Sequence, residues 1–222
     1  MDNGIIFIDK PAGMTSFGVV ARIRRVLSKK SLMSGGKKVK VGHTGTLDPF
    51  ATGLMILVIG SECKNAGNYS KLDKVYEATI CLGQISTTGD PEGAISDVSN
   101  KQPTESELID VFQKFTGKIS QRPPIYSAIK IDGQRAYKLA RKGEKVDMPE
   151  RQVMVYSLDL ISYSYPDVTI RVHVSSGTYI RSLATDIGQS LGVGAYCSQL
   201  RRIEISQWKV GDAKQLSDFG VL

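Results

Sequence analysis

The sequence predicts an α+β fold, in which a mixed and largely antiparallel sheet carries flanking helices. Segments with strand patterning and segments with helix patterning are interspersed along the chain. They do not follow the regular strand–helix–strand repeat of a parallel sheet. Two strand-like segments, 153–161 and 167–175, are separated only by a turn at Tyr165–Pro166–Asp167, which is typical of a hairpin. We therefore expect neighbouring strands to run mostly antiparallel.

Three further segments are predicted to be strands. Residues 4–9 form a short apolar run that ends at Lys10–Pro11, and residues 54–59 form a continuous apolar run typical of a buried strand. Residues 75–82 alternate, as a half-buried strand does. The face expected to be buried carries Tyr76, Ala78, Ile80 and Leu82.

Three helices are predicted from capping residues and apolar stripes. The first begins at Thr15 or Ser16, and the second follows a capping box at Thr104–Glu107 and ends at Gly117. The third spans 178–190. The apolar stripes are Val19, Val20, Ile23, Val26 and Leu27 in the first helix, and Leu108, Ile109, Phe112 and Phe115 in the second. A polar, basic loop is expected at 28–40.

The composition favours a polyanionic partner and a cytoplasmic protein. The net charge is +7, and each phosphate that Lys or Arg neutralises releases a condensed counterion. No apolar run approaches the ~18 to 20 residues that a membrane-spanning helix needs. The apolar stretch near the N-terminus is too short for a signal peptide. We therefore expect a cytoplasmic protein that does not bind membranes.

The sequence also argues against metal and cofactor chemistry. The three cysteines lie far apart with no CxxC pair, and the two histidines, His43 and His173, are distant in sequence. No GxxxxGK[ST] phosphate loop is present, and no GxGxxG follows a strand. We therefore expect no metal ion and no nucleotide or other cofactor. The chemistry of such a chain depends on carboxylates, tyrosine, lysine and arginine.

The segment GHTGTLDPFATG, residues 42–53, is unusual on physical grounds. Its glycines and proline shape the loop, and Asp48 lies between Leu47 and Pro49. A residue before proline is kept out of helical geometry, so Asp48 is expected on extended backbone. A carboxylate held rigidly beside a buried strand suits a preorganised site. An ordinary Asp-Pro turn is the alternative, and the spacing alone favours that alternative.

The whole chain resembles a known family of RNA-modifying enzymes. The segment GHTGTLDPFATGLMILVIG resembles the catalytic motif of the TruB-type tRNA pseudouridine synthases. Four more segments resemble that family in the same order, and the resemblance covers about residues 4 to 206: GIIFIDKPAGMTS, VYEATICLGQISTTGDPEG, RPPIYSAIKIDGQRAYKLARKGE and SSGTYIRSLATDIGQSLG. The resemblance implies the pseudouridine synthase fold. It also implies isomerisation of the T-loop uridine of tRNA, uridine-55, by base flipping and without metal or cofactor.

The resemblance assigns roles to seven residues. Asp48 is the catalytic carboxylate, Tyr76 packs on the target base and is the candidate base for its C5 proton, and Arg181 pairs with the carboxylate. The implied substrate contacts are His43, Lys64, Tyr179 and Leu200. An arginine beside Asp48 would keep that carboxylate ionised by charge pairing.

Basic residues outside these motifs are predicted to follow the RNA backbone. They are Lys37, Lys38, Lys40, Arg141 and Lys142. Residues 122–151 resemble a thumb-like lid that closes on the T-loop, and we expect this lid to be mobile without RNA. Members of the family usually continue into a small C-terminal RNA-binding (PUA) domain, whereas sixteen residues follow Ser206 here. We expect residues 1–222 to form one catalytic domain, a short form without that extra domain, and a monomer.

Two other functions fit the same residues. An RNA-binding factor that opens and refolds the tRNA elbow would need the same groove and the same flipping residues. A synthase for another RNA, such as ribosomal RNA, would keep Asp48 but change the loop contacts. Replacing Asp48 with Asn distinguishes the isomerase from the RNA-folding factor. Competition between T-arm and ribosomal RNA fragments distinguishes the tRNA synthase from a synthase for another RNA.

Overall fold

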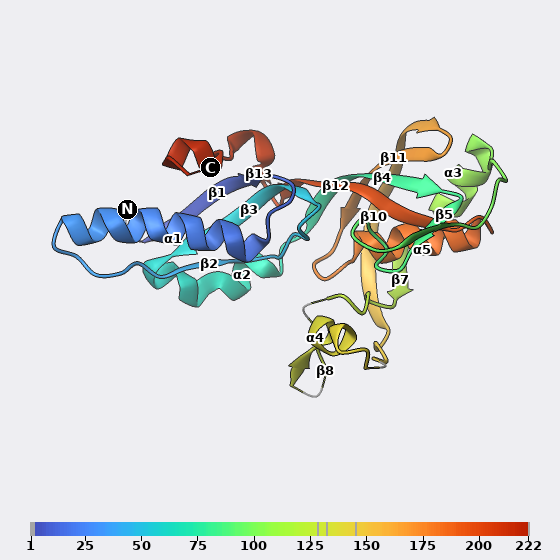
Figure 1. The fold of residues 1–222 in the computed structure, drawn as a ribbon. Coiled ribbons are helices and arrows are strands. Elements are labelled where there is room, and N and C mark those ends of the chain that lie inside the picture. Colours follow the sequence, from blue (N-terminus) through green and yellow to red (C-terminus); the bar gives the residue numbers. More distant parts are fainter. Residues whose placement is uncertain (1–2, 128, 132, 145, 222) are drawn as a thin grey trace. The chain divides into compact units, whose positions relative to one another are not determined.

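The structure is a computed structural model, and it describes residues 3–127, 129–131, 133–144 and 146–221. The chain divides into two compact units (Figure 1). Unit 1 comprises residues 1–76 and 201–222, and unit 2 comprises residues 77–200. Two strands, β4 (Lys74–Leu82) and β12 (Ala195–Ile205), contribute residues to both units.

Unit 1 is built around β3 (Thr52–Ile59), the predicted buried strand. It pairs antiparallel with β1 (Gly4–Lys10) and β2 (Val41–His43), and parallel with the end of β12. Its side chains Leu54 and Ile56 pack with Ile205 of β12 in a buried cluster. The other elements of unit 1 are α1 (Ser16–Met33), η1 (Gly60–Asn65), α2 (Ala66–Ser70), β13 (Trp208–Lys209), η2 (Val210–Asp212) and η3 (Leu216–Phe219).

Helix α1 confirms the predicted start and corrects the predicted end. Thr15 is the N-cap, since its side chain accepts a hydrogen bond from the amide of Gly18. The helix runs to Met33, so the expectation of a loop over 28–40 is wrong for residues 28–33. Lysine, leucine and methionine are good helix formers, and the first glycine of the segment comes only at Gly35, which has φ 78°.

The sheet of unit 2 confirms the antiparallel expectation. From β12 the strand order is β4, β11 (Asp167–Val174), β10 (Arg151–Ser164) and β7 (Gly117–Gln121). β10 pairs antiparallel with both β11 and β7. The predicted alternation of β4 is also confirmed, because Tyr76, Ala78, Ile80 and Leu82 are all buried.

Two helices of unit 2 lie where the sequence predicted them. α3 (Glu105–Lys114) follows a complete Thr104–Glu107 capping box, and α5 (Ile180–Ser190) fills the expected third position. One prediction for α3 is wrong: Ile109 is 43% exposed, whereas Val111 is buried with Leu108 and Phe112. The helix packs against β10 and α5, and Ile109 lines an open cavity between α3 and β10, which leaves its side chain exposed.

The segment between β7 and β10 contains short elements of its own. They are β8 (Lys130–Ile131), β9 (Gln134–Arg135) and α4 (Ala136–Arg141). Figure 1 shows α4 and β8 together, away from the sheet of unit 2 and connected to it through the end of β7 and the start of β10. Within the predicted lid 122–151, residues 128, 132 and 145 lie outside the described residues. Two remaining short strands, β5 (Gln84–Ser86) and β6 (Ile95–Asp97), form a separate hairpin.

Candidate active site

Asp48 lies in a loop without helix or strand structure, and the chain on its C-terminal side is tightly held. The carbonyl of Pro49 accepts hydrogen bonds from the Gly13 amide at 2.9 Å and from Lys10 Nζ at 3.1 Å. Lys10 is fully buried and also donates to the carbonyls of Pro11 and Met14. The Asp48 carbonyl accepts from the Ala51 amide at 3.2 Å. A buried cation surrounded by carbonyl oxygens thus fixes the turn that follows Asp48.

The chain on the N-terminal side of Asp48 is held just as closely. The Ser16 hydroxyl donates to the Leu47 carbonyl and accepts from the Leu47 amide, both at 2.8 Å. Arg202 is 1% exposed and donates from Nη2 to the Gly45 carbonyl at 3.1 Å and from Nε to the Leu54 carbonyl at 2.7 Å. The loop is therefore anchored to β1, to α1 and to β12.

Close packing requires a glycine at position 53, the end of this segment. Gly53 has φ 106°, and a Cβ atom at this position would lie 2.2 Å from the carbonyl oxygen of Arg202. Only glycine allows β12 to approach so closely. The same approach brings the Arg202 guanidinium under the loop.

Three other predicted catalytic or substrate-binding residues belong to unit 1. His43 ends β2 opposite Leu57 of β3, and Tyr76 is 8% exposed near the start of β4. Lys64 lies in η1 and is exposed. Two positions before Tyr76, Lys74 donates to the carbonyls of Ser70 and Leu72. Burial, and next the charge of Arg202, lower the pKa of Lys74 to about 8.

Arg181, in unit 2, is a buried residue with a defined set of acceptors. It is 3% exposed, and its Nη1 lies 2.9 Å from Asp90 Oδ2. Nη1 also donates to the Thr88 carbonyl, and Nη2 donates to the Tyr126 carbonyl, both at 2.9 Å. The side chain of Asp90 is 4% exposed, so the ion pair is well shielded from water. Because Asp48 belongs to unit 1, its pairing with Arg181 stays a prediction.

Tyr179, also in unit 2, is held at its backbone and at its ring. The Gln121 carboxamide is 1% exposed; its Oε1 accepts from the Tyr179 amide at 2.8 Å, and its Nε2 donates to the Tyr179 carbonyl at 3.0 Å. Arg151 Cζ lies 4.9 Å from the centre of the Tyr179 ring, within the range of a cation–π contact. Leu200 is a buried residue of β12.

The predicted RNA-backbone residues are at the surface wherever their side chains are described. Lys37, Lys38 and Lys40 are exposed in the chain between α1 and β2. Lys142 follows α4 and lies 3.8 Å from Glu144. Arg141 is the last residue of α4, and its side chain falls outside the described part of the structure.

Sequence reasoning missed the residues that hold the predicted ones in place. Asp90 lies in the segment VYEATICLGQISTTGDPEG, and like Asp48 it is followed by a proline in a glycine-containing loop. That local similarity is the one signal that could have singled it out. Gln121, Arg151 and Arg202 have no comparable local signal, because each acts on a partner far away in the sequence.

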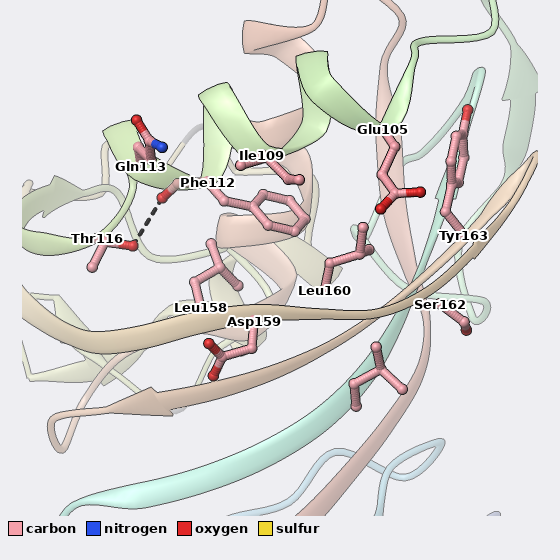
Figure 2. Close-up of a pocket in the computed structure, with 11 residues that line it drawn as sticks. Glu105, Ile109, Phe112, Gln113, Thr116, Leu158, Asp159, Leu160, Ser162 and Tyr163 are labelled. Carbon is pink, nitrogen blue, oxygen red and sulfur yellow. Dashed lines mark hydrogen bonds between the residues drawn. The ribbon is translucent and has the colours of Figure 1, made fainter.

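A cavity of about 720 Å³ lies elsewhere in unit 2, between α3 and β10 (Figure 2). Phe112 and Leu160 line it together with the carboxylates of Glu105 and Asp159. None of the predicted site residues line this cavity. Among the described residues, no helix is long and apolar enough to cross a membrane, and no group of three or more His, Cys, Asp or Glu side chains could hold a metal ion.

Comparison with known proteins identifies the class of this fold. The crystal structure of a Cbf5-Nop10-Gar1 complex contains a chain that matches with a TM-score of 0.74 and 31% identity. The match covers 98% of the present chain and 53% of that chain, so the present chain spans about half the length of the Cbf5 relative. A second structure, an H/ACA RNP bound to a substrate RNA, matches with a TM-score of 0.70. The fold is that of the pseudouridine synthases.

Sequence comparison then defines the family. The TruB family pseudouridylate synthase (N-terminal domain) model matches residues 29–180. The "tRNA pseudouridine synthase B" of Corynebacterium diphtheriae is 43% identical over 97% of this chain and 71% of its own length. The proteins of the same name from Geobacter sulfurreducens and Opitutus terrae are both 41% identical, over 72% and 86% of their lengths. The chain belongs to the TruB family of pseudouridylate synthases.

Proposed function

We propose that this chain isomerises uridine-55 in the T-loop of tRNA to pseudouridine. Relatives that carry the name tRNA pseudouridine synthase B, and match nearly the whole chain, support this substrate. The observation that carries the proposal is the Asp48 loop. Its neighbouring peptide groups are fixed by the buried residues Lys10, Ser16 and Arg202. A carboxylate on such a frame has the preorganisation that an active site needs.

The proposed reaction is an isomerisation without a cofactor. The bond between N1 of uracil and C1′ of the ribose breaks, and the base rotates while it stays in the pocket. A bond then forms between C5 and C1′; C5 loses its proton, and N1 gains one. Asp48 acts on the sugar, either as the nucleophile at C1′ or in the removal of a sugar proton. Tyr76 packs on the base and accepts the C5 proton.

Arg181 has one task in this proposal, and a buried partner sets its position. Its charge favours the ionised form of Asp48, and its position depends on Asp90, 2.9 Å from Nη1. The Tyr126 carbonyl, an acceptor for Nη2, belongs to the lid segment 122–151. The hydrogen bond from Arg181 to Tyr126 therefore links the position of Arg181 to the conformation of the lid.

Substrate binding involves a flipped nucleotide and the phosphates around it. Flipping a base out of its stack costs a few kcal/mol, and stacking on aromatic side chains and contacts to phosphates offset this cost. His43, Lys64, Tyr179 and Leu200 are the proposed contacts of the loop and the target base. Lys37, Lys38, Lys40, Arg141 and Lys142 are the proposed contacts to the backbone. We propose that the chain acts as a cytoplasmic monomer on the T-arm, as a single catalytic domain.

We also propose that residues 122–151 close on the T-loop. An ion pair between Arg122 and Glu150, 3.3 Å apart, joins the two ends of this segment, and the Ser182 hydroxyl of α5 donates to the Arg122 carbonyl at the first end. Between these ends the segment forms its own hairpin and helix, so it can move as a unit. Hydrogen exchange with and without tRNA tests this. Equal protection in the two states would contradict closure.

An unmodified T-arm stem-loop provides the test of the function. The protein is incubated with this RNA, and pseudouridine is mapped by carbodiimide chemistry. The wild-type chain should convert the target uridine, and Asp48→Asn should abolish conversion while it leaves the Kd for the RNA nearly unchanged. Conversion by Asp48→Asn at the wild-type rate would refute the proposal. A wild-type chain that binds the stem-loop but never converts it would favour the RNA-folding alternative.

A further inference from the structure

Ser16 makes an unusual pair of contacts to the residue that precedes Asp48. It is 2% exposed, and Leu47 is 3% exposed. The single hydroxyl of Ser16 accepts from the Leu47 amide and donates to the Leu47 carbonyl, each at 2.8 Å. The two residues are 31 positions apart, so this is a tertiary contact between the start of α1 and the loop.

The Leu47 carbonyl sets the orientation of Asp48 directly. That carbonyl and the Asp48 amide belong to one planar peptide unit, which does not flex easily. A hydrogen bond to the carbonyl therefore fixes the plane from which the Cα–Cβ bond of Asp48 projects. On the other side, the Asp48 carbonyl is held by the Ala51 amide. Both peptide units that meet at Asp48 are thus constrained, and a side chain supplies the constraint on the first.

The hydroxyl of Ser16 is not needed to start its helix. Thr15 is the N-cap of α1, and its Oγ1 accepts from the Gly18 amide at 3.0 Å. Ser16 is the first helical residue, one position further on. The Ser16 side chain bonds to Leu47 in the loop, whereas the Thr15 side chain caps the helix. The sequence Thr15–Ser16 therefore divides two tasks between two similar hydroxyls.

We propose that Ser16 is a positioning residue for the reaction, which sets the orientation of Asp48 through the Leu47 peptide. This inference rests on the proposed role of Asp48. Loss of the hydroxyl would leave a buried amide and a buried carbonyl without their partner, and the loop would shift until both were satisfied. A displacement of about 1 Å at a reacting group costs about 100-fold in rate.

Three variants of the full chain test this proposal against a purely structural role. They are Ser16→Ala, which removes the hydroxyl, Ser16→Cys, which substitutes a weaker hydrogen-bonding group, and the matched control Thr15→Ala. For each we would measure the single-turnover rate on the T-arm stem-loop at saturating protein, the Kd for the same RNA, and the Tm. Thr15→Ala removes a cap from the same helix without a contact to the loop, so it should lower the Tm and leave the rate unchanged.

For Ser16→Ala we expect a rate about 10- to 100-fold below wild type, with a Kd within about twofold. Ser16→Cys should lose several-fold in rate, and it serves as the readout if Ser16→Ala fails to fold. A wild-type rate in either Ser16 variant would overturn the proposal, as would an equal loss of rate in Thr15→Ala. An inactive wild-type chain would instead refute the proposed function, so the two failures are distinguishable.

Discussion

The interior of this protein and its basic surface segment use charge in opposite ways. Lys10 is fully buried among three carbonyl oxygens, and Arg181 and Asp90 form an ion pair whose side chains are 3% and 4% exposed. In segment 34–40, by contrast, Lys37, Lys38 and Lys40 are exposed, and none forms an ion pair within the described residues. Buried charges have fixed partners and so define geometry. Exposed lysines keep their charge available to a distant phosphate.

The largest effect should come from removing a buried partner. Asp90→Asn keeps the size of the side chain but leaves the buried Arg181 guanidinium without the negative charge of Asp90. Breaking a buried ion pair from one side costs about 3 to 5 kcal/mol. We expect a loss of that order in the free energy of unfolding, together with a single-turnover rate at least about 100-fold lower. Denaturant unfolding and the T-arm assay measure the two effects.

An exposed ion pair in the same unit provides the control for Asp90→Asn. Arg171 Nη2 lies 2.7 Å from Glu77 Oε1, but the two side chains are 54% and 36% exposed. Exposed pairs contribute about 0 to 1 kcal/mol, so Arg171→Gln should change the stability very little. If Asp90→Asn were no more harmful than Arg171→Gln, the Asp90–Arg181 contact would not define the position of Arg181.

Neutralising the surface segment should have a smaller effect, of a different kind. A triple Lys→Gln change at Lys37, Lys38 and Lys40 should weaken RNA binding about tenfold at low salt. Each lost phosphate contact should reduce the slope of log K against log salt by about 0.7 to 0.9. The rate at saturating protein and the free energy of unfolding should stay nearly unchanged, because these side chains have no buried partner.

The matched control for the lysine variant keeps the same change in net charge. Lys114, Lys118 and Lys209 are also exposed, and no RNA contact is proposed for them. Their triple Lys→Gln variant should bind RNA with a nearly unchanged salt slope. Equal slopes for the two triple variants would show that net charge alone, and not segment 34–40, attracts the RNA.

The same contrast explains what the sequence could and could not predict. Local signals placed the Asp48 loop, because glycine and proline restrict the backbone wherever they occur. They also limited the start of α1 to Thr15 or Ser16, but the choice depends on Leu47, 31 residues away from Ser16. Ile109 was assigned to a buried stripe because a helical period defines a face. Which edge of that face is covered depends on the elements that pack against the helix in the folded chain.

Long-range pairs between charged residues were the main omission. Asp90 and Arg181 are 91 positions apart, and neither residue shows by its neighbours that the other will lie beside it. The family resemblance implied a role for Arg181 toward Asp48 but did not indicate Asp90. The end of α1 was missed for a different reason. Lysines were interpreted as loop residues although their helix propensity is high, and nothing breaks the helix before Gly35.

The smallest predicted effect concerns Asp186, a carboxylate that differs from Asp90 by having no counter-charge. It lies on α5, five positions after Arg181, and its side chain forms no ion pair or hydrogen bond within the described part of the chain. Burial raises its pKa from the ordinary 3.8 to about 6. Ionisation is therefore easier in the unfolded chain than in the folded one. As pH rises from about 4 to about 6, the carboxyl ionises in the unfolded chain but stays mostly protonated in the folded one. The free energy of unfolding therefore falls over this range.

Asp186→Asn should remove that penalty. The full shift in pKa would correspond to about 3 kcal/mol, but the carboxylate is only partly buried, so we expect a gain of about 1 kcal/mol at pH 7. The gain should be several-fold smaller near pH 4, where the wild-type carboxyl is protonated in the folded state and only about half ionised in the unfolded one. Urea unfolding of both proteins at pH 4 and pH 7 measures it. A gain of equal size at both pH values would mean that packing, and not the unpaired charge, distinguishes Asp186 from Asp90.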